Sequence, residues 1–417
     1  MAQLSSDLEA FGEPMRSVDE AVKHIGASLA PVPDVDVVPL GRADGRVLAR
    51  HLIAPLALPP FTNSAVDGYA VRFADLAAAS GPFVVADRVT AGAAAKGPLP
   101  QGQAVRIFTG APMPEGADTV FMQEDVRVDD LGRIHFPDGL RAGANVRPAG
   151  EDIPEGKLVL TKGRRLRPQE IAVLAAFGQT EVEVRRPVRV AVFSTGDEIV
   201  SPGAARGPSQ LFDSNRFLLA AMLRRLGCEV GDLGVLADDP HLIAAALLRA
   251  AEAHDLILAS GGVSTGEADH VKVGVEKAGT LVFWRVAIKP GRPIAMGSVS
   301  GVPFMGLPGN PVASFVTFVY LAREAVLALA GAASEPFVAI PARSAFGYRK
   351  KAGRREYVRA NLRRDAAGVL EAVKFPREGA GLLSSLIDTD GLVELPERTI
   401  RVESGDIVSF LPYSLLF

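Results

Sequence analysis

The pattern of apolar and polar residues changes along the chain and predicts domains of different kinds. From residue 188 to 331, apolar runs typical of buried strands alternate with segments typical of helices. This alternation predicts a doubly wound α/β domain built on a parallel sheet. Between residues 54 and 150, and again after residue 335, short β-like runs are separated by glycine and proline. Those two regions therefore read as small β-rich units.

Two helical segments lie outside these regions. Ser17 and Glu20 form a capping-box pattern that opens an amphipathic helix. A second helical segment follows Pro168 and ends at Gly178. We therefore predict a multidomain fold of class α/β plus β, divided into a discontinuous N-terminal helical and linker domain (1–50 and 151–186), a β-rich inserted domain (51–150), an α/β domain (187–333) and a C-terminal β domain (334–417).

Composition and charge exclude several classes of protein. Cys228 is the single cysteine, so an intrachain disulfide and a cysteine-based metal site are excluded, and a reducing compartment is favoured. The formal net charge of −3 gives no general attraction to nucleic acid or to an anionic membrane. The acidic N-terminus lacks the features of a signal peptide, and we expect no membrane-spanning run. A cytoplasmic protein is the resulting expectation.

The turn SGGVSTGEADH, residues 260–270, carries the strongest chemical signal. It lies between a buried strand and a helix, at the edge of an α/β sheet where ligands bind. Gly261 and Gly262 let backbone N–H groups approach an anion, and a helix N-terminus favours negative charge. Glu267 and Asp269 would repel a bare phosphate. The conflict is resolved if a divalent cation such as Mg²⁺ bridges carboxylates and phosphate.

Other polar turns are expected at the same edge, at residues 194–198, 213–215, 238–240 and 306–314. Each also has an ordinary interpretation. Glu198 fits an exposed loop charge, Asp238 or Asp239 fits a helix cap, and Gly309-Asn310-Pro311 fits a helix start. Their convergence at one edge is the stronger signal, because unrelated turns need not share that side of the sheet.

The segment RVAIKPGRP brings Arg285, Lys289 and Arg292 close together in the sequence. Strand alternation would place Arg285, Ala287 and Lys289 on one face, and two cations on one face suit an oxyanion. The alternative is a solvated basic edge.

Three turns of the inserted domain are also rich in polar residues. Asp67 lies in PPFTNSAVDGYAVR, Thr109 in RIFTGAPMPEGADTV and Asp152 in VRPAGEDI. Spacing alone marks all three as turns and assigns them no chemistry.

Taken together, these segments resemble the MoeA family of molybdopterin molybdenumtransferases, which includes the gephyrin E domain. The α/β part alone also resembles the related molybdopterin adenylyltransferases, so the motifs of the inserted domain discriminate between the two. The matching segments, in the family's order, are PPFTNSAVDGYAVR, RIFTGAPMPEGAD, NVRPAGEDI, VFSTGDEI, FDSNRF, SGGVSTGEADHVK, VAIKPGRP and GLPGNPVASF.

The resemblance implies an elongated homodimer of four-domain subunits, each with a small C-terminal β-barrel domain. The active cleft would lie between the α/β domain of one subunit and the inserted domain of the other. Molybdenum from molybdate would enter adenylylated molybdopterin, and AMP would be released with Mg²⁺ as the divalent cation. Transient contacts with the upstream adenylyltransferase and with molybdopterin synthase also fit the resemblance.

The resemblance assigns residues to this cleft by position in the matching motifs. Those carried over are Asp67, Thr109, Asp152, Glu198, Asp238, Asp269, Arg285, Lys289, Pro308 and Pro311. Asp239 is an alternative to its neighbour Asp238. Thr62 and Val66 depart from the residues that many members have beside Asp67, and Arg285 stands where lysine is frequent, which changes a point charge into a planar fork.

The chemistry suggests a role for each group of candidates. Asp269 and Glu198 are candidates for holding the metal, with Glu267 as a weaker one. Lys289, Arg292 and Ser264 are candidates for holding molybdate, and backbone N–H groups at Gly261, Gly262, Gly309 and Asn310 for receiving phosphates. The reaction needs no nucleophilic side chain, so we expect electrostatic positioning.

Two rival functions remain open from the sequence. A molybdopterin adenylyltransferase would consume ATP and would leave the inserted domain unexplained. A pterin-binding scaffold would keep the fold without turnover, but it would have no need of the carboxylates Asp67, Glu198 and Asp269.

Overall fold

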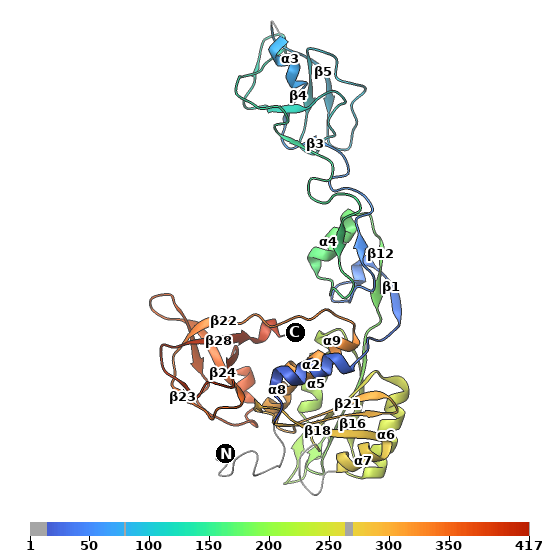
Figure 1. Cartoon of the computed structure of the whole chain (residues 1–417), viewed down its shortest axis with the longest axis vertical. Helices are drawn as coiled ribbons and strands as arrows, with labels where there is room; N and C mark the ends of the chain where they lie inside the picture. The colour runs from blue at the N-terminus through green and yellow to red at the C-terminus, as the bar shows by residue number, and fades with distance from the viewer. Residues whose placement is uncertain (1–14, 79–80, 263–269, 417) are drawn as a thin grey trace.

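The computed structural model describes residues 15–78, 81–262 and 270–416. The chain is elongated (Figure 1), with the inserted domain at one end and the α/β domain beside the C-terminal β domain at the other. A small unit containing α4 (Pro168–Ala176) and β12 (Glu181–Arg185) lies between the two ends. The multidomain architecture predicted from the sequence is therefore confirmed, whereas the predicted boundaries stay a prediction.

A six-stranded mixed sheet forms the centre of the α/β domain. Its four parallel strands are followed by two antiparallel ones at one edge. In spatial order the strands are β16 (Glu229–Leu236), β13 (Arg189–Thr195), β17 (Leu256–Ser260), β21 (Val302–Leu307), β20 (Pro293–Val299) and β18 (Gly279–Arg285).

Helices cover both faces of this sheet, as a doubly wound fold requires. On β13, Val190 and Val192 pack into one core and Ala191 and Phe193 into the other, which is the two-residue alternation of a strand. The first core holds α5 (Asn215–Arg225), α8 (Pro311–Thr317), η2 (Phe318–Ala322) and α9 (Arg323–Leu329), and the second holds α6 (Pro240–Ala253) and α7 (His270–Ala278).

The continuous helical stretch Pro311–Leu329 is long and apolar enough to cross a membrane, with a mean hydropathy of 1.7 over its most apolar window. This helix does not contradict the expectation of no membrane-spanning run, because length and composition are the only criteria that it meets. Of that window, 89% is buried inside the fold. Its apolar side chains pack against the sheet and the neighbouring helices, which is the ordinary position of a core helix.

Helix α2 (Val18–Ser28) begins at the predicted capping box. The Ser17 hydroxyl accepts the N–H of Glu20 at 3.2 Å, and the Glu20 carboxylate accepts the N–H of Ser17 at 2.8 Å. Val18, Ala21 and Ile25 belong to the α/β core, and α2 lies beside α9 (Figure 1). The sequence grouped this helix with the linker domain, but its apolar face is buried against the α/β domain instead.

The linker unit consists of two short antiparallel pairs and one helix. Strand β1 (Val35–Pro39) pairs with β12 (Glu181–Arg185), and β2 (Leu52–Ile53) pairs with β11 (Leu158–Leu160). Helix α4 (Pro168–Ala176) begins at Pro168, which the sequence marked as its start, and the turn η1 (Leu40–Arg42) contacts it. The chain thus passes through this unit on its way into and out of the inserted domain.

Acid is expected to destabilise the linker unit through Glu170 of α4. Its buried carboxylate lies 2.7 Å from Arg167 Nη2 and 2.5 Å from Arg164 Nη2. Hydrogen bonds from Arg167 lower the pKa of Glu170 from 4.5 to about 2. Since the folded pKa is depressed, the stabilisation is complete above about 4.5 and is lost as the pH falls toward about 2.

Thermal unfolding between pH 5 and pH 2 measures this effect. Glu170→Gln should flatten the acid dependence of the transition relative to the wild type. Glu155→Gln, at an exposed position of the same unit, should not change it. An unaltered acid dependence in Glu170→Gln would contradict the assignment.

The inserted domain contains a four-stranded sheet, a short helix and two strand pairs. The pairs are β3 (Asn63–Ser64) with β10 (Val146–Arg147) and β8 (Arg127–Val128) with β9 (Ile134–His135). Helix α3 (Phe73–Ala78) follows β4 (Gly68–Val71). The sheet order is β5 (Val84–Val89), β6 (Gln103–Ile107), β4 (Gly68–Val71) and β7 (Thr119–Met122).

The C-terminal strands close into a small barrel, as the resemblance implied. Each strand pairs with the next and the last pairs with the first, in the order β24 (Arg355–Arg364), β25 (Leu370–Lys374), β22 (Ile340–Ser344), β28 (Ile407–Pro412) and β26 (Gly391–Leu395). Strand β19 (Ile288–Lys289), which follows β18 in the chain, pairs with β24. This pairing fastens the barrel to the α/β domain.

Candidate active site

Two adjoining cavities lie where the parallel strands of the α/β sheet end. The smaller has a volume of about 450 Å³ and is lined by the ends of β13 and β17 and the start of α5. The larger, of about 1110 Å³, lies between that edge and the barrel. Both cavities are lined by Glu198, Gly261, Gly309, Asn310 and Gly381. The two cavities therefore form one cleft.

The glycines of the first turn are required by its backbone geometry. Gly261 and Gly262 have φ angles of +86° and +62°. A Cβ on Gly262 would lie 2.3 Å from Cγ2 of Val271, so helix α7 could not pack as it does. The Gly261 N–H donates to the Leu307 carbonyl at 3.1 Å. The expectation that this N–H receives a phosphate is therefore wrong, because it extends the ladder between β17 and β21.

Glu198 lies in the loop after β13, at the junction of the two cavities. Its exposed side chain folds back over Gly196, where a Cβ would lie 2.6 Å from Glu198 Oε2. The Glu198 carbonyl accepts the N–H of Leu211 at 2.7 Å, which fixes the loop. The backbone of this loop thus places Glu198 at the mouth of the cleft.

The two aspartates of the turn before α6 have different positions and different partners. Asp239 is the N-cap, and its Oδ1 accepts the N–H groups of His241 and Leu242 at 2.8 and 3.0 Å. Asp238 faces the strand ends, with Oδ1 3.5 Å from Thr195 Oγ1 and 3.2 Å from His270 Nδ1. The cap is therefore Asp239, which leaves the Asp238 carboxylate at the edge of the sheet.

These positions predict different effects on stability. Asp239→Ala should lower the free energy of unfolding by about 1 kcal/mol, because two N–H groups of α6 lose their acceptor. Asp238→Ala should change it by less than about 0.5 kcal/mol, because this residue caps nothing. Urea unfolding of the two variants measures the difference, and equal losses would contradict the assignment of the cap.

The second glycine turn opens α8. Asn310 occupies the N-cap position and Pro311 the first helical position, as the sequence suggested. A Cβ on Gly309 would lie 3.5 Å from Cα of Gly261, so the two glycine turns are in close approach. Pro308 and Gly309 line the larger cavity with Asn310, and Pro311 lines the smaller one.

Of the three predicted cations, two line the cleft. Lys289 and Arg292 belong to the wall of the larger cavity, whereas Arg285 lines neither cavity. The alternation argument for Arg285 is wrong, because β18 ends at Arg285 and Lys289 belongs to a separate strand. That strand, β19, pairs with the barrel. The alternation of side chains along β18 therefore does not continue to Lys289.

Sequence reasoning missed several residues of the cleft. The buried amide of Asn215 donates to Ser260 Oγ at 2.9 Å and to the Gly309 carbonyl at 2.7 Å, and so ties the two turns together. The barrel strands carry no motif that signals a site. The barrel strands and the segments that connect them nevertheless contribute polar side chains to the larger cavity, including Tyr348, Arg354, Glu356, Arg359, Lys374, Arg377 and Glu378.

Asp67 and Thr109 form a polar pair on the inserted domain. Asp67 Oδ1 accepts the Thr109 backbone N–H at 2.8 Å and its hydroxyl at 2.7 Å. Both hydrogen bonds lower the pKa of Asp67 below its ordinary value, and the bond from the backbone N–H has the larger effect. The Asp67 carboxyl group therefore stays an anion. Asp152 is exposed farther along the chain, beside the contact of Leu58 with Ile153.

A single chain does not bring these two sets of residues together. The β4 strand that follows Asp67 lies at one end of the molecule, and β21 of the cleft lies at the other, with the linker unit between them (Figure 1). The predicted residues Ser264, Glu267 and Asp269 lie outside the described residues. Among the residues that are described, no group of three or more His, Cys, Asp or Glu side chains gathers as a metal site would require.

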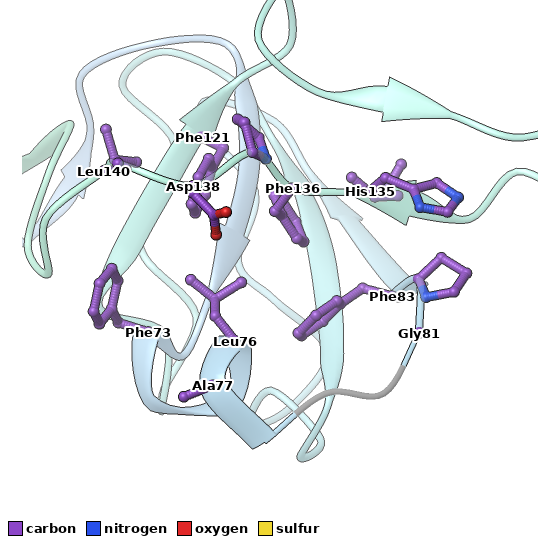
Figure 2. A pocket seen from close by; sticks show the side chains of 14 residues that line it. Phe73, Leu76, Ala77, Gly81, Phe83, Phe121, His135, Phe136, Asp138 and Leu140 are labelled. Atoms are coloured by element: carbon purple, nitrogen blue, oxygen red, sulfur yellow. The ribbon is translucent and has the colours of Figure 1, made fainter.

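The inserted domain has a cavity of its own, of about 380 Å³. Figure 2 shows Phe73 and Leu76 of α3 near Phe83, Phe121 and Phe136 around it. None of the predicted site residues lines it. We therefore assign the candidate chemistry to the cleft of the α/β domain.

The chain matches three family models in sequence order. They are the MoeA N-terminal region (domain I and II) over residues 16–178, a probable molybdopterin binding domain over 191–328, and the MoeA C-terminal region (domain IV) over 341–413. Together the three models account for most of the chain.

Curated relatives and a solved structure match over nearly the full length. The chain is 37% identical to molybdopterin molybdenumtransferase of Haemophilus influenzae, over 96% of this chain and 100% of the relative. It is 36% identical to molybdopterin molybdenumtransferase 2 of Mycobacterium tuberculosis, over 94% and 98%. The molybdopterin biosynthesis moeA protein of Pyrococcus horikoshii OT3 is 29% identical and superposes with a TM-score of 0.82, over 96% of this chain and 100% of that structure.

Proposed function

Because the chain belongs to the MoeA family, we propose that it is a molybdopterin molybdenumtransferase, which inserts molybdenum from molybdate into adenylylated molybdopterin and releases AMP. The observation that carries the proposal is the composition of the cleft. The glycine turns, the carboxylate of Glu198 and the cations Lys289 and Arg292 all line the larger cavity. Such a cleft suits a substrate with a pyrophosphate and a second oxyanion.

The residues of the cleft would act by binding and orienting. The backbone at Gly262, Gly309 and Asn310 would receive phosphate oxygens, and Lys289 and Arg292 would hold molybdate. Water or a molybdate oxygen would attack phosphorus, and AMP would leave. The family's use of a pterin supports the assignment of the smaller cavity, beside Asn215, as part of the same substrate site.

The donors at the cleft mouth fit Mg²⁺ in kind. Glu198 and Thr195 offer oxygen atoms in the lining of the smaller cavity, and the Asp238 carboxylate, which lines neither cavity, lies 3.5 Å from Thr195 Oγ1. Mg²⁺ prefers oxygen ligands. We propose that Glu198 and Asp269 hold the cation, with Asp238 nearby. When bound, Mg²⁺ would neutralise part of the phosphate charge.

We further propose a homodimer in which the insert of one subunit completes the cleft of the other. The distance between the two sets of residues within one chain supports this, because Asp67, Thr109 and Asp152 would otherwise have no place in the reaction (Figure 1). A cytoplasmic location and transient contacts with the upstream adenylyltransferase and molybdopterin synthase belong to the same proposal. The contacts rest on the resemblance, whereas the location and the expectation of no nucleic-acid or membrane partner rest on composition and charge.

Incubation with adenylylated molybdopterin, molybdate and Mg²⁺ tests the function. We expect AMP and molybdenum cofactor to form together, and omission of molybdate should prevent cofactor formation. Consumption of ATP with molybdopterin would instead identify an adenylyltransferase. Binding of the pterin without any AMP release would identify a scaffold.

A further inference from the structure

Glu356 is a carboxylate in the wall of the larger cavity, on barrel strand β24, and only 4% of the residue is exposed. A single oxygen, Oε2, accepts hydrogen bonds from Lys289 Nζ and from the Tyr348 hydroxyl, each at 2.9 Å. Lys289 Nζ also lies 3.4 Å from the Tyr348 oxygen. These three groups form a closed polar triangle between the α/β domain and the barrel.

The backbone fixes this triangle. Lys289 and Glu356 are direct register partners in the pairing of β19 with β24. Burial raises the pKa of Tyr348 above its ordinary value, and the Glu356 carboxylate adds to this effect, so the hydroxyl remains a donor. The Lys289 ammonium also lies 5.9 Å from the centroid of the Tyr348 ring, and this cation–π contact favours the same arrangement.

Charge neutralisation alone does not explain this carboxylate. The larger cavity is lined by Lys289, Arg292, Arg354, Arg359, Lys374 and Arg377, against the carboxylates Glu198, Glu356 and Glu378. In a wall that must attract oxyanions, a carboxylate bonded to Lys289 lowers the attraction. Its benefit must then be geometric, because a lysine ammonium on a four-carbon stem is otherwise free to move.

The bonds of Lys289 leave it able to act on a ligand. An ammonium has three donors, and at most two of them are used by Glu356 and Tyr348. The Lys289 side chain is still 47% exposed in the cavity wall. The remaining donor can therefore reach an oxyanion while the other bonds hold the nitrogen in place.

We propose that Glu356, assisted by Tyr348, is a positioning residue that fixes the Lys289 ammonium for oxyanion binding. This inference rests on the proposed function and extends it to the barrel. The barrel would then contribute to the site by fixing the position of a cation that belongs to the α/β domain.

A double-mutant cycle on Glu356 and Lys289 tests the proposal, with AMP release measured against molybdate concentration. Glu356→Gln should lower kcat/KM for molybdate by about tenfold or more, because the ammonium is no longer held in one position. Lys289→Met should lose at least as much. The double variant should lose less than about twofold beyond Lys289→Met, since a residue that acts through Lys289 has nothing left to position.

Further variants separate positioning from stability. Tyr348→Phe should give a smaller loss than Glu356→Gln, and that loss should also vanish on the Lys289→Met background. Glu371→Gln, on barrel strand β25 and outside both cleft cavities, is the matched control and should keep wild-type kinetics. Thermal unfolding of each variant shows whether it folds, and Glu356→Asp replaces Glu356→Gln if the latter does not.

The outcomes distinguish failure of the inference from failure of the function. Multiplicative losses in the double variant would overturn the positioning role, as would tighter molybdate binding with unchanged kcat in Glu356→Gln. Wild-type protein that releases no AMP would instead refute the proposed function itself.

Discussion

Glu198→Gln is expected to lower AMP release by about 10²–10³-fold while the protein keeps its fold. Glu198 lies at the junction of the two cavities, so its carboxylate is the group best placed to act on both the phosphates and a cation. The glutamine has nearly the same shape but no charge, and substitutions at exposed positions rarely change stability by more than about 0.5 kcal/mol. AMP measured by chromatography and thermal unfolding of the same preparation give the two quantities.

Asp197→Asn provides the control for that experiment. Asp197 is the adjacent exposed carboxylate and lines neither cavity of the cleft, so its variant should turn over like the wild type. If Glu198 helps to hold Mg²⁺, residual activity of Glu198→Gln should also need a higher Mg²⁺ concentration. Wild-type turnover by Glu198→Gln would remove this residue from the mechanism.

Two inactive variants, Asp67→Asn and Glu198→Gln, are expected to restore activity to each other when they share a dimer. Asp67 directly precedes β4 of the inserted domain, and Glu198 lines the cleft of the α/β domain. These two domains lie at opposite ends of one chain (Figure 1). If each site combines the insert of one subunit with the cleft of its partner, a mixed dimer has one intact site and one that carries both changes. The purified mixed dimer should therefore have about half the wild-type activity.

Coexpression with two affinity tags, followed by purification on both, isolates the mixed dimer. Asp67→Asn combined with Thr109→Ala is the matched control, because both changes affect the insert side and leave no intact site. Activity from the control pair, or none from the first pair, would contradict a cleft shared between subunits. Sedimentation of the wild type establishes the dimer independently.

Much of the fold could be predicted because its elements are set by local patterns. The capping box at Ser17 and the proline at Pro168 start helices where the sequence suggested, and the alternating strands and helices after residue 188 form the doubly wound domain. The position of α2 could not be predicted in this way. Its amphipathic pattern shows that one face is buried, but not which domain covers that face.

The residues of the candidate site also fall into those that local motifs identify and those that only tertiary packing identifies. The glycine turns and Glu198 were identified from motifs, since their chemistry depends on residues adjacent in the chain. The prediction that Arg285 and Lys289 share one strand face is wrong, because these residues lie only four positions apart yet belong to strands of different sheets. The barrel binds Lys289 into its own sheet through the pairing of β19 with β24. The periodicity of apolar and polar residues along one strand cannot show that a neighbouring segment joins another sheet.

The sequence by itself therefore determined the element types, the resemblance to the family and the residues of each turn, because periodicity, caps and motifs depend on neighbours a few positions apart. Only the tertiary structure decided that Asp239 caps α6 while Asp238 faces the strand ends, that Glu356 holds Lys289, and that the barrel walls the cleft. These results depend on which surfaces pack together across long separations in the chain. That choice is made by shape and charge complementarity over whole domains, which no short segment encodes.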